Sequence, residues 1–216
     1  MYPTAPSAGS PTSSEIPARP LPVPTHGPGG TFSVLARTTV SCAPSDVLEL
    51  VRDTSTWPRW NTFCPRAEFR EQGDGDGGEG WLNKGAKACI DVFLHGDGLV
   101  EGRTRSRVQD VEVTVLEALG REGGWEGPGP EGAKGWRIAW KSVGWSHWQL
   151  HSERVMEFRE VEGGTGYLCW ETFGGLLAPV VKRTVGSTLV DRFGDYARDV
   201  KQYLESTGVE EEVSTA

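Results

Sequence analysis

The chain of 216 residues contains no run of about 18 uncharged apolar residues, the length that a membrane-spanning helix needs. Positive charge is also scarce: 22 Lys and Arg stand against 30 Asp and Glu, which gives a formal net charge of −8. Contacts to nucleic-acid phosphates need clustered Lys and Arg. The sequence therefore predicts neither an integral membrane segment nor a nucleic-acid partner.

Cysteine is rare, and a targeting signal is missing. The four cysteines form no C-x-x-C pair and fit no zinc-binding spacing; they are Cys42, Cys64, Cys89 and Cys169. We expect them to be free thiols in a reducing compartment. The N-terminus lacks the basic and apolar stretches of a secretory signal. Together these absences predict a cytoplasmic protein.

The motifs of common catalytic sites are missing too. The sequence contains no G-x-S-x-G nucleophile elbow, no P-loop and no H-E-x-x-H pattern. It therefore identifies no catalytic residue, and we expect no cofactor and no bound metal.

Three regions of the chain differ in composition. Residues 1–30 are rich in Pro, Ser, Thr and Gly, and we expect a disordered tail because these residues bury little apolar surface. Residues 31–206 carry the patterns of strands and helices and predict one domain. Residues 207–216 are acidic and predict a second disordered tail. Gly-rich stretches at 72–80 and 120–135 predict mobile loops.

The order of elements within the domain is typical of an α+β fold. β-Branched and apolar residues at 31–40 predict a strand, and a short helix should begin at Pro44. A second short helix or turn follows around Pro58, and then about six strands. Residues 176–206 repeat apolar side chains at helical spacing and predict a long amphipathic helix. Antiparallel strands that lead into one long helix favour a curved sheet wrapped around that helix.

Three segments carry a resemblance to a known family. Residues 53–63 (DTSTWPRWNTF) resemble the helical turn after the first strand of START-like proteins, also called the SRPBCC superfamily. Residues 154–165 (RVMEFREVEGGT) and 170–177 (WETFGGLL) are similar to the last hairpin of that superfamily. With the final helix, the resemblance covers residues 31–206. The superfamily includes polyketide cyclase/dehydrase-like and coenzyme-Q-binding proteins.

The resemblance implies a helix-grip fold: a curved antiparallel sheet around a long C-terminal helix, with two short helices after the first strand. It also implies an internal cavity for a small hydrophobic ligand such as a lipid, quinone or polyketide-like molecule. Three functions stay open, because one fold hosts many activities. The chain binds or transports such a ligand, it acts on the ligand as a polyketide cyclase/dehydratase-like enzyme, or its tryptophans fill the interior of a non-catalytic scaffold.

Alternation along the predicted last hairpin and spacing on the last helix indicate which side chains face the cavity. The expected ligand-binding residues are Trp60, Arg154, Met156, Phe158, Glu171, Phe173, Phe193 and Tyr196. Arg154 and Glu171 should approach each other as a buried or half-buried ion pair. Such a pair either orients a polar group of the ligand and moves protons, or has a purely structural role. Trp60 and its neighbour Trp57 either line the cavity or pin the short helices to the sheet.

Aromatic and imidazole side chains are dense between 145 and 151, where Trp145, His147, Trp148 and His151 occur. They form either the mouth of the pocket or an exposed strand junction. The two histidines are four residues apart, a spacing that suits metal binding on a helix. The segment has the pattern of a loop and a strand, so we predict no metal site there.

Overall fold

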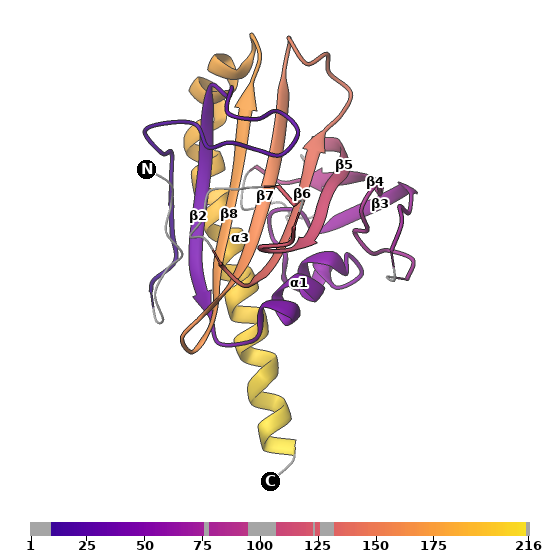
Figure 1. The fold of residues 1–216 in the computed structure, drawn as a ribbon, viewed down its shortest axis with the longest axis vertical. Coiled ribbons are helices and arrows are strands. Elements are labelled where there is room, and N and C mark those ends of the chain that lie inside the picture. The colour runs from indigo at the N-terminus through magenta and orange to yellow at the C-terminus, as the bar shows by residue number, and fades with distance from the viewer. Residues whose placement is uncertain (1–9, 76–77, 95–106, 123, 126–131, 215–216) are drawn as a thin grey trace, which may run out of the picture.

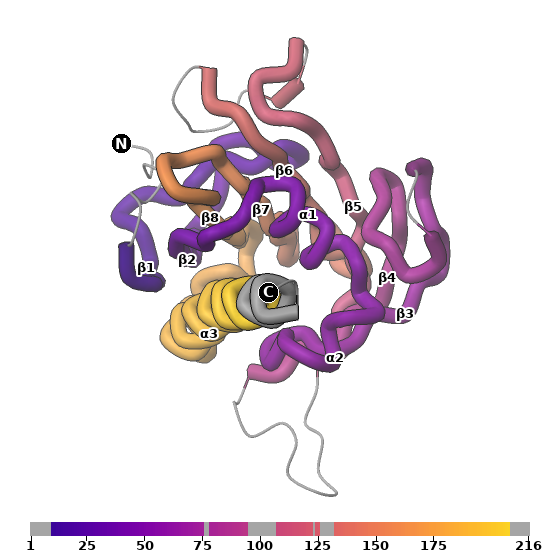
Figure 2. The backbone as a smooth tube through the Cα atoms, turned by 90° about the horizontal axis from the view of Figure 1, so that it is seen from below, coloured from indigo at the N-terminus to yellow at the C-terminus, as the bar shows by residue number. Residues whose placement is uncertain are grey.

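The computed structural model describes residues 10–75, 78–94, 107–122, 124–125 and 132–214. Its core is an eight-stranded antiparallel sheet in the order β1-β2-β8-β7-β6-β5-β4-β3. The sheet curves around the long helix α3 (Ala178–Ser214), as the view along that helix shows (Figure 2). The strands are β1 (Ser13–Glu15), β2 (Phe32–Val40), β3 (Arg66–Glu71), β4 (Lys87–Val92), β5 (Arg107–Ala118), β6 (Gly135–Ser142), β7 (His151–Val161) and β8 (Gly164–Gly174).

Two short helices, α1 (Pro44–Arg52) and α2 (Trp57–Trp60), connect β2 to β3 (Figure 1). α1 begins where the sequence predicts, because Pro44 occupies the first turn and the Asp46 carboxylate accepts a hydrogen bond from the Ala43 N–H. The expected helix-grip architecture is confirmed. No helix within the described residues is long and apolar enough to cross a membrane.

The concave face of the sheet holds the main core. The alternating residues Met156 and Phe158 of β7 and Tyr167 of β8 point to this side and are fully buried. They pack against one face of α3, where Phe193 and Val200 are also buried. Alternation of side chains along the strands therefore sets which residues meet the helix.

Residues 10–30, the N-terminal segment, contradict the prediction of a disordered tail at 1–30, while residues 1–9 lie outside the described part of the chain. Residues 10–30 lie against the sheet: β1 pairs with β2, and Leu21 and Val23 are buried. The indole N–H of Trp170 donates to the Pro22 carbonyl at 3.1 Å. The physical reason is that the convex face of the sheet is apolar in its centre, at Leu35, Val155 and Leu168 among others. Leu21 and Val23 therefore bury apolar surface against the sheet, and this burial favours order that the composition of the segment alone would not give.

The C-terminal prediction also needs correction. The sequence places the end of the helix at 206 and a disordered tail at 207–216, whereas α3 continues to Ser214. No proline interrupts this stretch, and its glutamates are compatible with a helix. The start of α3, at Ala178, is two residues later than expected.

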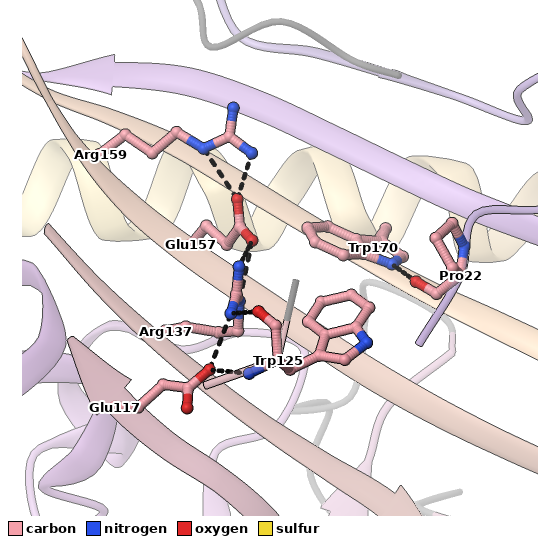
Figure 3. Close-up of polar contacts among 7 residues, drawn as sticks. All are labelled: Pro22, Glu117, Trp125, Arg137, Glu157, Arg159 and Trp170. Carbon is pink, nitrogen blue, oxygen red and sulfur yellow. Dashed lines mark hydrogen bonds and ion pairs between the residues drawn. The ribbon is translucent and has the colours of Figure 1, made fainter. Parts of the chain in front are cut away.

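A buried ionic network lies on the convex face (Figure 3). The Glu157 carboxylate accepts hydrogen bonds from the guanidinium groups of both Arg137 and Arg159. Arg137 also donates to Glu117 at 2.8 Å and to the Trp125 carbonyl at 2.7 Å. Trp125 belongs to the second Gly-rich stretch, which we expected to be a mobile loop, and its ring packs over Arg137. The N-terminal segment and Trp125 thus both cover parts of the convex face.

Candidate functional site

A cavity of about 360 Å³ lies between the concave face of the sheet and the first turns of α3. Its walls come from β4, β5, the connection between β6 and β7, the two central strands β7 and β8, and α3. The lining includes Phe63, Val92, Leu94, Val108, Gln109, Val143, Trp145, Leu150, Ser152, Arg154, Glu171, Phe173, Val181, Val185 and Leu189. Most of these side chains are apolar, and the volume falls in the range of small-molecule sites.

Arg154 and Glu171 lie where the two central strands contribute to the cavity wall. They are direct partners across the β7–β8 pair. The Arg154 Nε and one terminal nitrogen donate to the same carboxylate oxygen, Glu171 Oε2, at 3.1 and 2.9 Å. Within the described residues, no hydrogen bond reaches the other oxygen, Oε1. The predicted buried ion pair is therefore confirmed, and it keeps one carboxylate oxygen for another donor.

Aromatic rings surround the guanidinium group of Arg154. Its central carbon lies 4.4 Å from the ring centre of Phe193, 5.1 Å from that of Phe63 and 5.8 Å from that of Trp140. Burial works to lower the pKa of Arg154, but Glu171, Cys64 and Cys169 together outweigh burial and the net shift is upward. The side chain is therefore a permanent cation, stabilised by one carboxylate and by the faces of the rings.

Further polar groups lie close to this pair. A second, smaller cavity of about 20 Å³ is lined by Arg154, Glu171, Cys64 and Tyr196 together with apolar neighbours. The Tyr196 hydroxyl is buried and has no hydrogen-bond partner in the described part of the chain. Burial raises the pKa of Tyr196 well above its ordinary value, and burial likewise raises the pKa of Cys64 to about 11. Both groups are thus neutral near pH 7, and the phenol keeps its proton and can donate a hydrogen bond in the smaller cavity.

The structure divides the eight residues that the sequence analysis placed at the ligand. Arg154, Glu171 and Phe173 line the larger cavity, and Tyr196 lines the smaller one. The other four lie away from the walls of both cavities and fill the core: Trp60, Met156, Phe158 and Phe193. The reason is the close approach of α3, to which Phe193 belongs, so that all four side chains join one hydrophobic core.

Trp60 illustrates this correction. It meets Tyr196 edge to face at 5.4 Å and donates its indole N–H to Thr56. Trp60 therefore packs the short helices against the core and lines neither of the two cavities. Trp57 also packs in the core, but it borders the smaller cavity as well.

Trp145 and Trp148 lie in the connection between β6 and β7, and both are exposed by more than half. Trp145 lines the larger cavity, so this side of the cavity has an apolar, exposed rim. His147 of the same connection and His151 at the start of β7 do not line the larger cavity. His147 and His151 stack in parallel at 3.8 Å, and His26 of the N-terminal segment lies 4.5 Å from His151 between ring centres.

The sequence analysis did not single out His26. It belongs to the segment expected to be disordered and is 121 positions from His147 along the chain. No local pattern identifies such a contact, because the contact depends on how that segment crosses the sheet. Burial, followed by the charges of His151, His147 and Lys141, lowers the pKa of His26 to about 4.

Comparisons with solved structures show the same fold in several bacterial proteins at low sequence identity. A hypothetical protein from Helicobacter pylori has a TM-score of 0.57 and 13% identity, over 87% of this chain and 97% of its own. A STAR-related lipid transfer protein from Xanthomonas axonopodis has a TM-score of 0.53 and 10% identity, over 94% and 98% of the two chains. These likenesses confirm the START-like fold.

The sequence comparisons are more specific. No family model matches the chain. A protein from Penicillium oxalicum, named oxopyrrolidines biosynthesis cluster protein O, is 32% identical over 196 residues, which are 85% of this chain and 90% of the relative. The match thus covers more than two thirds of each chain. The chain therefore belongs to the family of this Penicillium oxalicum protein, on a START-like fold.

Proposed function

We propose that this protein binds a small, mostly apolar organic molecule in the cavity between the sheet and α3. The observation that carries the proposal is the buried Arg154–Glu171 pair in the wall of a mostly apolar cavity of about 360 Å³. The other polar residues of the lining are Arg107, Gln109, Asp110, Ser142 and Ser152. Apolar walls contribute most of the affinity through burial of ligand surface, and a few fixed polar groups set the orientation.

The chemistry of the pair indicates which polar group the ligand carries. Glu171 Oε1 accepts no hydrogen bond from the described residues, so it suits an O–H or N–H donor of the ligand. Arg154 contributes positive charge beside it, which suits a neighbouring carbonyl oxygen. A 2-oxopyrrolidine ring, for example, carries a carbonyl next to a ring nitrogen, and the relative is named for an oxopyrrolidines biosynthesis cluster. We therefore propose an intermediate of a biosynthetic pathway as the ligand.

A second candidate function is catalysis on the same ligand, of the cyclase or dehydratase kind. Two observations favour it: a carboxylate paired with a guanidinium borders the cavity, and the relative is named for a biosynthesis cluster. In this proposal Glu171 accepts a proton from a carbon or hydroxyl of the ligand, while Arg154 stabilises the charge on the carbonyl oxygen. The four free thiols fit a reducing compartment, and we place either function in the cytoplasm.

The binding proposal is tested with an apolar fluorescent probe such as 1-anilinonaphthalene-8-sulfonate, and by native mass spectrometry of the protein purified from its source. Val185 lines the cavity, whereas Val180, on the same helix, is more than half exposed and lines neither cavity. We expect Val185→Phe to weaken probe binding at least about tenfold, because the larger ring takes up cavity volume. A tenfold loss of affinity corresponds to about 1.4 kcal/mol of binding free energy. Val180→Phe is the matched control and should bind as the wild type does.

Equal binding by both variants would contradict the cavity as the site and support the scaffold function instead. Catalysis is tested separately, by adding pathway intermediates to the wild type and to Glu171→Gln and Arg154→Ala. Turnover that both substitutions abolish supports the enzyme. Turnover that survives both removes the catalytic assignment, while an intact copurified ligand without turnover supports carriage.

A further inference from the structure

Three imidazoles from distant parts of the chain meet on the convex side of the sheet. His26 comes from the N-terminal segment, His147 from the connection between β6 and β7, and His151 from the start of β7. Their candidate ligand nitrogens all lie within 4.8 Å of one another. The ring centres of His26 and His147 are 5.0 Å apart. This cluster is separate from the Arg154–Glu171 pair, which lies on the concave side.

A single turn of backbone brings two of these rings together. The N–H groups of Gln149 and Leu150 both donate to the Ser146 carbonyl, so the chain makes one helix-like turn here. Residues four apart on such a turn share a side. From the sequence we expected a loop and a strand here, in which a spacing of four residues has no advantage. The helix-like turn instead brings His147 and His151 to the same side of the chain.

Hydrogen bonding decides which nitrogen of His151 is available. Its Nδ1 lies 2.6 Å from the His147 carbonyl oxygen, which only accepts hydrogen bonds. In the neutral ring Nδ1 therefore carries the proton, which leaves the lone pair on Nε2. A backbone carbonyl bound to the outer nitrogen is the usual way in which proteins orient a metal-binding histidine.

Two further observations concern the ring nitrogens of His26 and His151. The His26 Nε2 is buried and has no hydrogen-bond partner among the residues that the structure describes. The ring of His151 lies over Gly174, where a Cβ atom would come within 2.2 Å of Nε2. A glycine at this position is therefore what allows the His151 ring to lie there.

We propose that His26, His147 and His151 bind one divalent transition-metal ion, with zinc as the reference case and one coordination position open to water. Three neutral imidazoles suit zinc, copper and nickel and exclude the hard cations magnesium and calcium. Zinc–nitrogen bonds are about 2.0–2.1 Å long, so the three nitrogens must approach one another more closely than they do in the metal-free arrangement. His147 is exposed and free to tilt out of its parallel stack.

The site would connect parts of the protein that matter for the cavity. The N-terminal segment covers the convex face, and Thr25, next to His26, donates to the buried Glu153 carboxylate at 2.7 and 2.8 Å. The connection that holds His147 also contributes Trp145 and Leu150 to the cavity wall. A bound ion would therefore fasten this connection and the N-terminal segment to each other.

The test uses the full chain after treatment with EDTA, with Zn²⁺ followed by calorimetry and Co²⁺ by its visible absorption. We expect one ion per chain, and a loss of affinity of at least about tenfold in His147→Gln and in His26→Gln, since even an indirect partner of a metal ligand has an effect of that size. His147 is exposed, so its substitution leaves folding intact. His95, the remaining histidine, lies outside the described residues, and His95→Gln is the control.

Zinc should also raise the midpoint of thermal unfolding of the wild type and of His95→Gln but not that of His147→Gln. Binding that is equally strong in His147→Gln and the wild type would overturn the proposal, as would an equal loss in His95→Gln or a stoichiometry far below one. Circular dichroism shows that each variant is folded, so that a loss of binding reports on the site.

Discussion

Arg154 and Glu171 face each other across β7 and β8, and both hydrogen bonds of the guanidinium end on one carboxylate oxygen. The pair is almost completely buried, and its partners on the other side are aromatic rings. An ion pair in such a place offsets its own desolvation only if the geometry is good and the remaining lone pairs find donors. The free oxygen Oε1 is the reason to connect this pair with a ligand.

A double-mutant cycle measures the structural role of the pair. Arg154→Met and Glu171→Leu each leave one buried charge without a partner, and we expect each to lower the free energy of unfolding by about 3–5 kcal/mol. The double variant replaces both charges by apolar groups and should be clearly more stable than either single variant. Urea unfolding measures all four proteins. Losses that simply add in the double variant would show that the two residues do not interact.

The N-terminal segment offers a direct test of its packing. Leu21 is 4% exposed and belongs to the convex-side core, so Leu21→Ala should lower the free energy of unfolding by about 2–5 kcal/mol. Leu176 is 72% exposed, and Leu176→Ala should change stability by no more than about 0.5 kcal/mol. A neutral Leu21→Ala would mean that the segment is the disordered tail that its composition suggests.

Stability should fall at alkaline pH because of two buried thiols. Burial raises the pKa of Cys64 to about 11 and that of Cys169 to about 12, above the ordinary thiol value near 9. In the unfolded chain the thiols lose their protons first, so their contribution is complete below pH 9 and decreases as the pH rises toward 12. Each thiol steepens this decrease by up to about 1.4 kcal/mol per pH unit.

The measurement is the slope of the unfolding free energy against pH. Loss of packing by the smaller side chain lowers stability equally at each pH, so it does not change this slope. Cys169→Ala should flatten the slope between pH 9 and 12. Cys89→Ala is the control, since Cys89 is only half-buried and its thiol should have a smaller effect. An unchanged slope in Cys169→Ala would contradict the assignment to that thiol.

The turn between β7 and β8 requires glycine for two reasons. Gly164 has a φ of +147°, and a Cβ atom there would lie 2.2 Å from the Val40 carbonyl oxygen. We expect Gly164→Ala to destabilise the protein by about 1–3 kcal/mol or more, because the backbone and the contact both resist a side chain. Gly29 has open space around its α-carbon, so Gly29→Ala should be close to neutral. Thermal unfolding of both variants and the wild type measures the difference.

Local patterns along the chain were sufficient for the architecture and for the central ion pair. Period-two alternation on the last hairpin places Arg154, Met156 and Phe158 on one face, and the Gly-Gly-Thr turn sets the register that brings Arg154 opposite Glu171. Helical spacing at the C-terminus and proline at the start of α1 are equally local signals. These features depend on neighbours within a few residues, so they are readable from the sequence alone.

Only the tertiary structure decided what fills the space around that pair and what covers the sheet. Whether Phe193 lines a cavity or seals it depends on how closely α3 approaches β7, which the sum of many side-chain volumes determines. The N-terminal segment is ordered because Leu35, Val155 and Leu168 expose an apolar surface on the convex face. His26 meets His151 for the same reason, since a contact over more than 100 positions follows from where the segment crosses the sheet.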